Sequence, residues 1–430
     1  MDKRKRSPSR SPSRSPPRQR KRPGAASRLT QADREAAKQR QIAREQEQEK
    51  AALEANKSRG VHDVVKQHYN MVPERGRDWR NTASKITGLR SYNNWVKSCT
   101  IQKFIGPDRG LNVLDIGCGK GGDLGKWSSS RKVALYVGCD PADVSITQAQ
   151  ERYDKMKRKP FRAEFYAKDC FGESLADIEI IRNVGFETNA GPGGNATAQR
   201  WGRGGFDIVS MMFCMHYAFE SEEKARGMLR NVAGALKKGG RFLGTIPNSD
   251  VLSAKVTEHH KGAPTEGDAN GSPNFDSDDD WDPEKIIDAP APKEKKEEKE
   301  EGQEDGELED EGVEWGNSIY RVKFPGKTPT DGVFRPPFGW KYFYFLEEAV
   351  EEVPEYVVPW EAFRALAEEY NLELQYRAAF KDVWEQERND PELGPLSERM
   401  NVRDRSGRLL VRQEELDAAS FYHTFCFYKV

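Results

Sequence analysis

Residues 113–127 read VLDIGCGKGGDLGKW, and this stretch carries the strongest signal for the fold of the chain. The apolar run Val113-Leu114 ends at Asp115, and a turn follows that contains four glycines, Gly117, Gly119, Gly121 and Gly122. Because glycine lacks a Cβ atom, such a turn can adopt positive φ and bring backbone N–H groups close to a ligand. We therefore predict a strand, a ligand-binding turn and a helix, in this order.

Two acidic residues narrow the choice of ligand. Asp115 stands two residues before Gly117, where a dinucleotide-binding turn normally carries an apolar residue. A second predicted strand, 134–139, leads into Asp140, about 20 residues after the turn, the distance at which an acid meets a ribose diol. A glycine-rich turn alone is also typical of NAD, FAD and phosphate sites, and a tight turn without a ligand is the simplest alternative. With both acids in place, the pattern resembles the class I methyltransferase fold, which binds S-adenosyl-L-methionine.

The composition indicates that only part of the chain is globular. Charged residues make up 32% and hydrophobic residues 36% of the 430 residues, which is too polar for a chain that folds throughout. The net charge of −1 hides a segregation, because residues 1–30 are basic and residues 294–314 are strongly acidic. We interpret both blocks as solvated segments that do not contribute to a core.

These patterns predict one folded domain with a tail and two insertions. Residues 1–60 are expected to be a disordered, basic Arg/Ser-rich tail and linker, and residues 61–430 the domain. Within the domain, residues 183–205 are expected to form a Gly-rich loop and residues 259–312 an acidic disordered insert.

The six cysteines stand singly, at positions 99, 118, 139, 170, 214 and 426, without a C-x-x-C pair. We therefore expect a reducing compartment, and neither a disulphide framework nor a zinc site. The N-terminus carries charge but no apolar segment of the kind found in signal peptides, and no apolar run approaches the length of a membrane span. These features predict a soluble, intracellular protein without a membrane partner.

Strand and helix patterns alternate between residues 112 and 246, as they do in an α/β fold whose mostly parallel sheet has helices on both faces. The predicted strands are 112–116, 134–139, 163–167, 206–212 and 241–246, and the predicted helices are 121–129, 143–157 and 220–237, with another helix beginning at 91–97. The helix at 220–237 is expected to end at Gly239-Gly240. Further along the chain, 338–345, 372–376 and 420–428 are strand-like and 360–370 is helix-like.

Seven blocks together resemble the eukaryotic mRNA cap guanine-N7 methyltransferases: SYNNWVKS, LDIGCGKGGDLGKW, CDPADVSITQAQERY, HYAFES, GGRFLGTIPNS, EEVPEYVVP and SFYHTFCF. The resemblance covers most of residues 61–430, outside the two insertions. It implies methyl transfer from S-adenosyl-L-methionine to N7 of the 5′ terminal guanosine of capped pre-mRNA. Guanine N7 already carries a free lone pair, so positioning and charge complementarity can supply catalysis without a general base. We therefore expect no catalytic residue and no metal.

The resemblance also implies the residues that bind S-adenosyl-L-methionine, namely Lys97, Gly117, Asp140, Asp169, Met212 and Tyr217. Gly117 and Lys97 would lie at the methionine moiety, Asp140 would accept from the ribose hydroxyls, and Asp169 would pair with the adenine edge. Relatives carry glutamine at position 212, so Met212 is expected to contact the cofactor through its backbone. The simpler interpretations are that Asp169 caps a turn and that Tyr217 is a core aromatic residue.

By the same resemblance, the cap-binding residues are Asn93, Asn94, Lys120, Lys126, Arg152, His216, Glu355 and Tyr422. The three cations would offset the charge of the cap triphosphate. Glu355 would accept from guanine N1–H and N2–H₂ together, a donor pair that adenine lacks. Without the motif match, the cations would be interpreted as solvated surface charges and Glu355 as one more acid of an acidic stretch.

Three functions remain open from the sequence. The first is the cap methyltransferase, the second an inactive fold or adaptor that binds capped RNA, and the third a methyltransferase with a protein or small-molecule substrate. The retained glycine turn and the residues Asp140, Asp169, His216 and Glu355 favour the first. The basic clusters at 3–6 and 18–22 predict nuclear import, with a weakly RNA-attracting tail as the alternative. The expected partners are capped pre-mRNA and other capping or transcription machinery.

Overall fold

The computed structural model describes residues 61–71, 84–194, 204–262 and 312–430, all within the unit 61–430. The predicted tail, most of the predicted acidic insert and the middle of the predicted Gly-rich loop lie outside the described residues.

A seven-stranded sheet forms the centre of this unit, in the order β10–β11–β5–β4–β1–β2–β3. Its strands are β1 (Leu111–Ile116), β2 (Val133–Asp140), β3 (Arg162–Ala167), β4 (Phe206–Met212), β5 (Leu236–Pro247), β10 (Leu372–Ala379) and β11 (Tyr422–Lys429). Strands β1 to β5 pair in parallel, and β11 pairs antiparallel with both β5 and β10. The predicted mostly parallel sheet is therefore confirmed.

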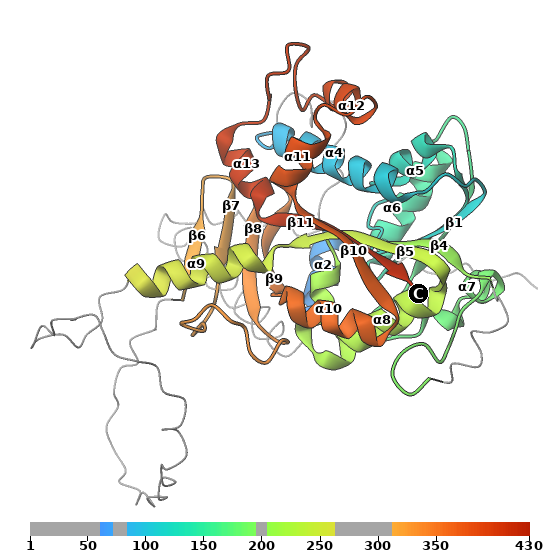
Figure 1. Ribbon diagram of the computed structural model, residues 1–430, viewed down its shortest axis with the longest axis horizontal. Coiled ribbons are helices and arrows are strands. Elements are labelled where there is room, and N and C mark those ends of the chain that lie inside the picture. The colour runs from blue at the N-terminus through green and yellow to red at the C-terminus, as the bar shows by residue number, and fades with distance from the viewer. Residues whose placement is uncertain (1–60, 72–83, 195–203, 263–311) are drawn as a thin grey trace, which may run out of the picture. The chain divides into compact units, whose positions relative to one another are not determined.

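Helices cover both faces of this sheet. Adjacent residues of a strand point to opposite faces: Val113 belongs to a buried cluster with Ile101 and Trp127, whereas Leu114 belongs to another with Leu229 and Val232. The first cluster is formed with α4 (Thr87–Phe104), α5 (Leu124–Ser130) and α6 (Asp143–Asp154), and the second with α7 (Glu179–Val184), α8 (Glu222–Ala235) and α10 (Trp360–Glu369). Figure 1 shows α4, α5 and α6 on one side of the sheet and α8 and α10 on the other.

A second, smaller sheet is antiparallel and has the order β6–β7–β8–β9. Its strands are β6 (Glu314–Gly316), β7 (Tyr320–Lys323), β8 (Lys341–Leu346) and β9 (Val350–Tyr356). Tyr342 and Tyr344 of β8 share a buried cluster with Tyr92 and Trp95 of α4. Helices α11 (Phe380–Glu387), α12 (Leu393–Arg399) and α13 (Gln413–Ser420) contribute to the same cluster, which therefore joins this sheet to α4. Of these four strands, the sequence predicted only β8.

The predicted helix 220–237 is wrong at its C-terminal end. Helix α8 stops at Ala235 and β5 begins at Leu236, directly after it. The pairing between β4 and β5 jumps from Phe206–Leu236 to Ile208–Arg241, and Gly239 has a φ of 82°. The two glycines therefore form a bulge within β5 rather than a helix cap.

Other boundaries differ for local reasons. The helix predicted from residue 121 begins at Leu124, because Gly119 and Gly121 have positive φ and belong to the turn. The predicted Gly-rich loop begins too early, since α7 extends through Val184, and the predicted acidic insert begins too early, since α9 (Ser249–Gly262) extends through residue 262. Helix α2 (Val61–Met71) begins where the sequence predicted order to start, and it packs against β9 and α6.

Candidate active site

The glycine turn between β1 and α5 requires glycine for both conformation and space. Gly117 has a φ of 70°, and a Cβ atom placed there would lie 2.5 Å from the Cys214 sulfur. The Gly117 N–H donates to the Cys139 carbonyl at 2.7 Å, and the Gly119 N–H donates to Asp140 Oδ2 at 2.9 Å. The turn is therefore held against the end of β2 by its own backbone.

Asp115, the acid before the turn, is a structural anchor. Its side chain is buried, with 2% of the residue exposed, and each carboxylate oxygen accepts one hydrogen bond. Tyr136 of β2 donates to Oδ2 at 2.7 Å, and Ser210 of β4 donates to Oδ1 at 2.7 Å. Burial and the charge of Asp123 raise the pKa of Asp115 to about 7, against the opposing effect of these two hydrogen bonds.

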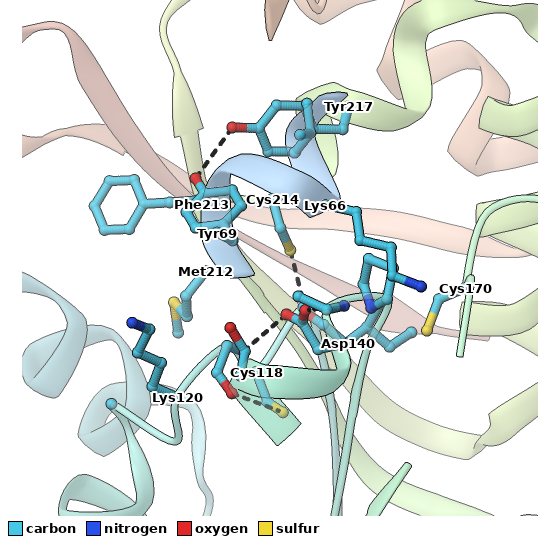
Figure 2. Close-up of a pocket in the computed structure, with 18 of the residues that line it drawn as sticks. Lys66, Tyr69, Cys118, Lys120, Asp140, Cys170, Met212, Phe213, Cys214 and Tyr217 are labelled. Carbon is cyan, nitrogen blue, oxygen red and sulfur yellow. Dashed lines mark hydrogen bonds between the residues drawn. The ribbon is translucent and has the colours of Figure 1, made fainter. Parts of the chain in front are cut away.

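A cavity of about 470 Å³ opens at the carboxyl ends of the parallel strands, the edge where α/β sheets bind ligands. All six residues predicted to bind the cofactor line it: Lys97, Gly117, Asp140, Asp169, Met212 and Tyr217. Figure 2 shows Asp140, Met212 and Tyr217 around this space, with Lys120 beside them. The structure therefore brings together, from five separate segments, the residues that the sequence motifs predicted to bind the cofactor.

The two acids at the strand ends are held rigidly by backbone donors. Asp140 accepts from Gly119 N–H and from Ala142 N–H, both at 2.9 Å. Asp169 accepts through Oδ1 from Phe171 N–H at 2.9 Å and Gly172 N–H at 3.2 Å. Asp169 does cap a turn, as the simpler interpretation stated, but it also lines the cavity. These carboxylates need no rearrangement to face a ligand.

Two lysines near the glycine turn form ion pairs with the same carboxylate, that of Asp123. Lys97 lies 2.8 Å and Lys126 lies 2.6 Å from Asp123 Oδ1, and Lys126 also donates to Asn94 Oδ1 at 2.7 Å. The two ammonium groups hold the pKa of Asp123 well below its usual range although burial opposes this, while burial and the Lys97 charge lower the pKa of Lys126 to about 8. Lys126 does not line the cavity, and only 11% of its side chain is exposed.

The other residues predicted to bind the mRNA cap fall into two groups. Lys120 and Arg152 line the cavity, whereas Asn93, Asn94, His216, Glu355 and Tyr422 do not. Asn93 lies on α4, and its buried Oδ1 has no hydrogen-bond partner among the described residues. Both ring nitrogens of the buried His216 are likewise without a hydrogen bond in the described part of the chain, although Nε2 lies 3.3 Å from Glu355 Oε1.

Glu355 of β9 is buried among phenol groups, with 5% of the residue exposed. Tyr342 donates to its Oε2 at 2.8 Å, and Tyr217 donates to its Oε1 at 3.4 Å. Burial, followed by neighbouring groups that include Glu355, raises the pKa of Tyr217, Tyr342 and Tyr422 well above the usual range. Since Tyr217 also lines the cavity, it connects this carboxylate to the cavity wall.

Sequence reasoning missed the contribution of α2. Val65, Lys66 and Tyr69 of this helix line the cavity, as do Cys118, Cys170, Phe213 and Cys214. Val65 and Tyr69 are four residues apart, which places them on one helical face, and this spacing was the available signal. The six cysteines are all free thiols. No cluster of metal-ligating side chains and no helix able to cross a membrane occurs within the described ranges.

The parallel strand order, the single antiparallel strand β11 and the acids at the strand ends define a class I, Rossmann-like methyltransferase fold. The family model of the mRNA (guanine-N(7))-methyltransferase domain matches residues 52–281 and 303–430, so the chain belongs to this family. The family predicted from the sequence is thus confirmed.

Three curated relatives, each named an mRNA cap guanine-N(7) methyltransferase, show the extent of the similarity. The Aspergillus fumigatus protein is 58% identical over 449 aligned residues, which cover 96% of this chain and 64% of that protein. The Aspergillus clavatus protein is 57% identical, with 96% and 77% covered, and the Schizosaccharomyces pombe protein is 41% identical, with 86% and 82% covered. The chain thus spans less than two thirds of the first relative.

Titration of Asp115 is expected to make stability depend on pH. The unfolded chain releases this proton near the ordinary value of 3.8, and the native state keeps it until about pH 7. Between these values the native state binds one more proton, so this residue's contribution to stability falls by up to about 1.4 kcal/mol per pH unit. Above pH 7 the loss stops.

Urea unfolding of the wild type and Asp115→Asn between pH 5 and 8 measures this effect. The asparagine cannot ionise, so the stability of the wild type relative to the variant should fall as the pH rises to about 7 and then level off. A difference in the free energy of unfolding that is constant with pH would show that Asp115 does not titrate in this range.

Proposed function

We propose that this chain transfers the methyl group of S-adenosyl-L-methionine to N7 of the 5′ terminal guanosine of capped pre-mRNA. The observation that carries the proposal is the direct link, through Tyr217, between the cavity at the strand ends and the buried carboxylate of Glu355. One ligand would lie on each side of this residue. An inactive adaptor would need only the cap side, whereas in this chain all six residues predicted to bind the cofactor also line one cavity.

The cavity fits the cofactor by size and by the chemistry of its walls. A volume of about 470 Å³ is within the range of small-molecule sites. We assign Asp140 to the ribose hydroxyls, Asp169 to the adenine edge, and Gly117 and Lys97 to the methionine moiety. Met212, whose side chain is nearly buried, and Tyr217 would flank the bound molecule. The bound donor supplies an electrophilic sulfonium methyl group.

Glu355 is the proposed acceptor for the guanine edge. Its two oxygens accept one phenol hydroxyl each, which leaves lone pairs for N1–H and N2–H₂. His216 and Asn93 have buried polar atoms without a hydrogen bond in the described part of the chain, and a buried polar atom without a hydrogen bond costs free energy. A ligand that pairs with them recovers this cost. We therefore assign His216, Asn93 and Tyr422 to the guanosine.

The phosphate chain of the cap is assigned to Lys120 and Arg152 from the cavity wall, with Asn94 and Lys126 beside them. Lys126 is bound to Asp123 and Asn94, so we propose that it contributes positive charge and holds Asn94 rather than closing directly on phosphate. No residue here acts as a base, because N7 has no proton to lose. The residues hold nucleophile, methyl and sulfur in line, which is the catalytic contribution of proximity.

Nuclear localisation and contact with other capping or transcription machinery are part of the proposal. They are supported by the basic clusters at 3–6 and 18–22 and by the names of the curated relatives. Microscopy of the tagged full chain, compared with a variant in which both clusters are neutralised, tests the localisation.

A transfer assay on capped RNA tests the activity. With labelled donor, RNA ending in GpppG should be methylated, whereas RNA carrying 7-deazaguanosine in the cap should not, since its N7 is replaced by carbon. RNA ending in ApppG should be a poor substrate, because adenine lacks the donor pair that Glu355 requires. Binding of GpppG without transfer would instead support the inactive adaptor.

Asp140→Asn should weaken cofactor binding. The change removes the charge from hydrogen bonds worth about 1.5–3 kcal/mol each, so calorimetry should show a dissociation constant roughly 10- to 100-fold higher for S-adenosyl-L-methionine. Asp154→Asn is the matched control, because Asp154 binds Lys159 at 2.8 Å at the end of α6 and does not line the cavity. Equal affinity in both variants would remove Asp140 from the site.

Glu355→Gln should affect the cap and spare the cofactor. The amide keeps the shape but replaces one acceptor with a donor. One guanine N–H group is then left without an acceptor in a buried site, at a cost of about 1–3 kcal/mol. We expect kcat/KM for GpppG-RNA to fall by about 10- to 100-fold, with near-normal cofactor affinity. Glu352→Gln, in the same strand but exposed, is the control. Equal loss of both ligands would indicate misfolding.

A further inference from the structure

Helix α2 is a wall of the cavity that comes from a distant part of the sequence. Asn70 at its end donates to Asp143 Oδ1 at 3.0 Å and accepts from Val144 N–H at 3.3 Å, which attaches the helix to the start of α6. This attachment presents Val65, Lys66 and Tyr69 to the cavity. Tyr69 and Tyr217 face each other in Figure 2, joined by a hydrogen bond.

The direction of the hydrogen-bond chain from α2 follows from the chemistry of its last member. The Tyr69 and Tyr217 hydroxyl oxygens are 3.2 Å apart, and Tyr217 donates to Glu355 Oε1 at 3.4 Å. Tyr217 has a single proton, which it donates to Glu355. The Tyr217 oxygen must then accept from Tyr69, and the chain runs from Tyr69 through Tyr217 to Glu355.

We propose that Tyr69 is a positioning residue for guanine recognition, which orients the Tyr217 hydroxyl and thereby fixes the lone pairs that Glu355 offers to the base. This inference rests on the proposed function, in which Glu355 accepts from guanine. With the Tyr69 proton in place, Tyr217 has one orientation. Without it, the Tyr217 hydroxyl can rotate away from Glu355. Glu355 Oε1 then loses the donor that occupies one of its lone pairs and thereby determines which lone pair is left for guanine.

The surroundings of Tyr69 support this role. Burial raises the pKa of its hydroxyl, its hydrogen bond with Tyr217 opposes the rise, and the charges of Glu355 and Asp140 add to it. The phenol therefore stays protonated, as a donor must. Tyr69 also lines the cavity, and its hydroxyl oxygen lies 3.2 Å from that of Tyr217, so it is close to both the proposed cofactor site and the Tyr217–Glu355 hydrogen bond.

The test removes one hydroxyl and measures both ligands separately. In Tyr69→Phe, KM for GpppG-RNA and the calorimetric dissociation constant for GpppG should rise about 3- to 10-fold, while the affinity for S-adenosyl-L-methionine stays within about 2-fold. Tyr376→Phe is the matched control, because its hydroxyl also donates to one side chain, Gln386 at 3.1 Å, outside the cavity. This control should change neither ligand.

A double variant separates positioning from a general structural effect. Because Tyr69 acts through Tyr217, Tyr69→Phe combined with Tyr217→Phe should weaken GpppG binding no more than Tyr217→Phe alone. Additive losses, unchanged GpppG affinity in Tyr69→Phe, or an equal loss of cofactor affinity would each overturn the inference. A wild type that binds GpppG but methylates no RNA would contradict the proposed activity alone, since the binding measurement still reports on Tyr69.

Discussion

The buried carboxylate of Asp115 is the constraint on which the site depends. By accepting from Tyr136 and Ser210 it joins the three neighbouring strands β2, β1 and β4. Each of these strands then delivers part of the cavity wall: the glycine turn after β1, Asp140 at the end of β2 and Met212 at the end of β4. A polar group this deeply buried is stable only when satisfied, so the ends of the strands are fixed relative to one another.

Much of the sheet could be predicted because its signals are local. Strand β4 was predicted with its observed bounds, and the apolar runs of β1 and β2 lead to Asp115 and Asp140, which lie within the last two residues of their strands. The bulge in β5 could not be predicted, since Gly239-Gly240 is equally suited to a helix cap and a strand irregularity, and only pairing with β4 decides between them. The small sheet was largely missed because β6 and β7 are short and their partners are set by tertiary packing.

The two halves of the candidate site differ in the same way. The positions on the cofactor side follow strand ends and a glycine turn, which are readable from one sequence. The hydroxyl groups linked to Glu355 have no common local sequence pattern. They belong to Tyr69 of α2, Tyr217 of the 3-10 helix Met215–Glu220 and Tyr342 of β8. Family resemblance supplied Glu355 and Tyr217, but not Tyr69 or Tyr342. The role of Lys126 could not be predicted from a motif alone, because its contacts with Asp123 and Asn94 depend on the three-dimensional structure.

The architecture suits a reaction without a general base. Where no proton is transferred, catalysis depends on holding two ligands in line, and small errors of orientation are costly. Backbone N–H groups hold Asp140 and Asp169, and phenol hydroxyls hold Glu355, so the polar groups that we propose for each ligand are positioned before it binds. Tyr217 belongs to both sets, because it lines the cavity and donates to Glu355. A side chain shared in this way would fix the distance between the two proposed sites, whereas two pockets on independently moving segments would leave this distance variable.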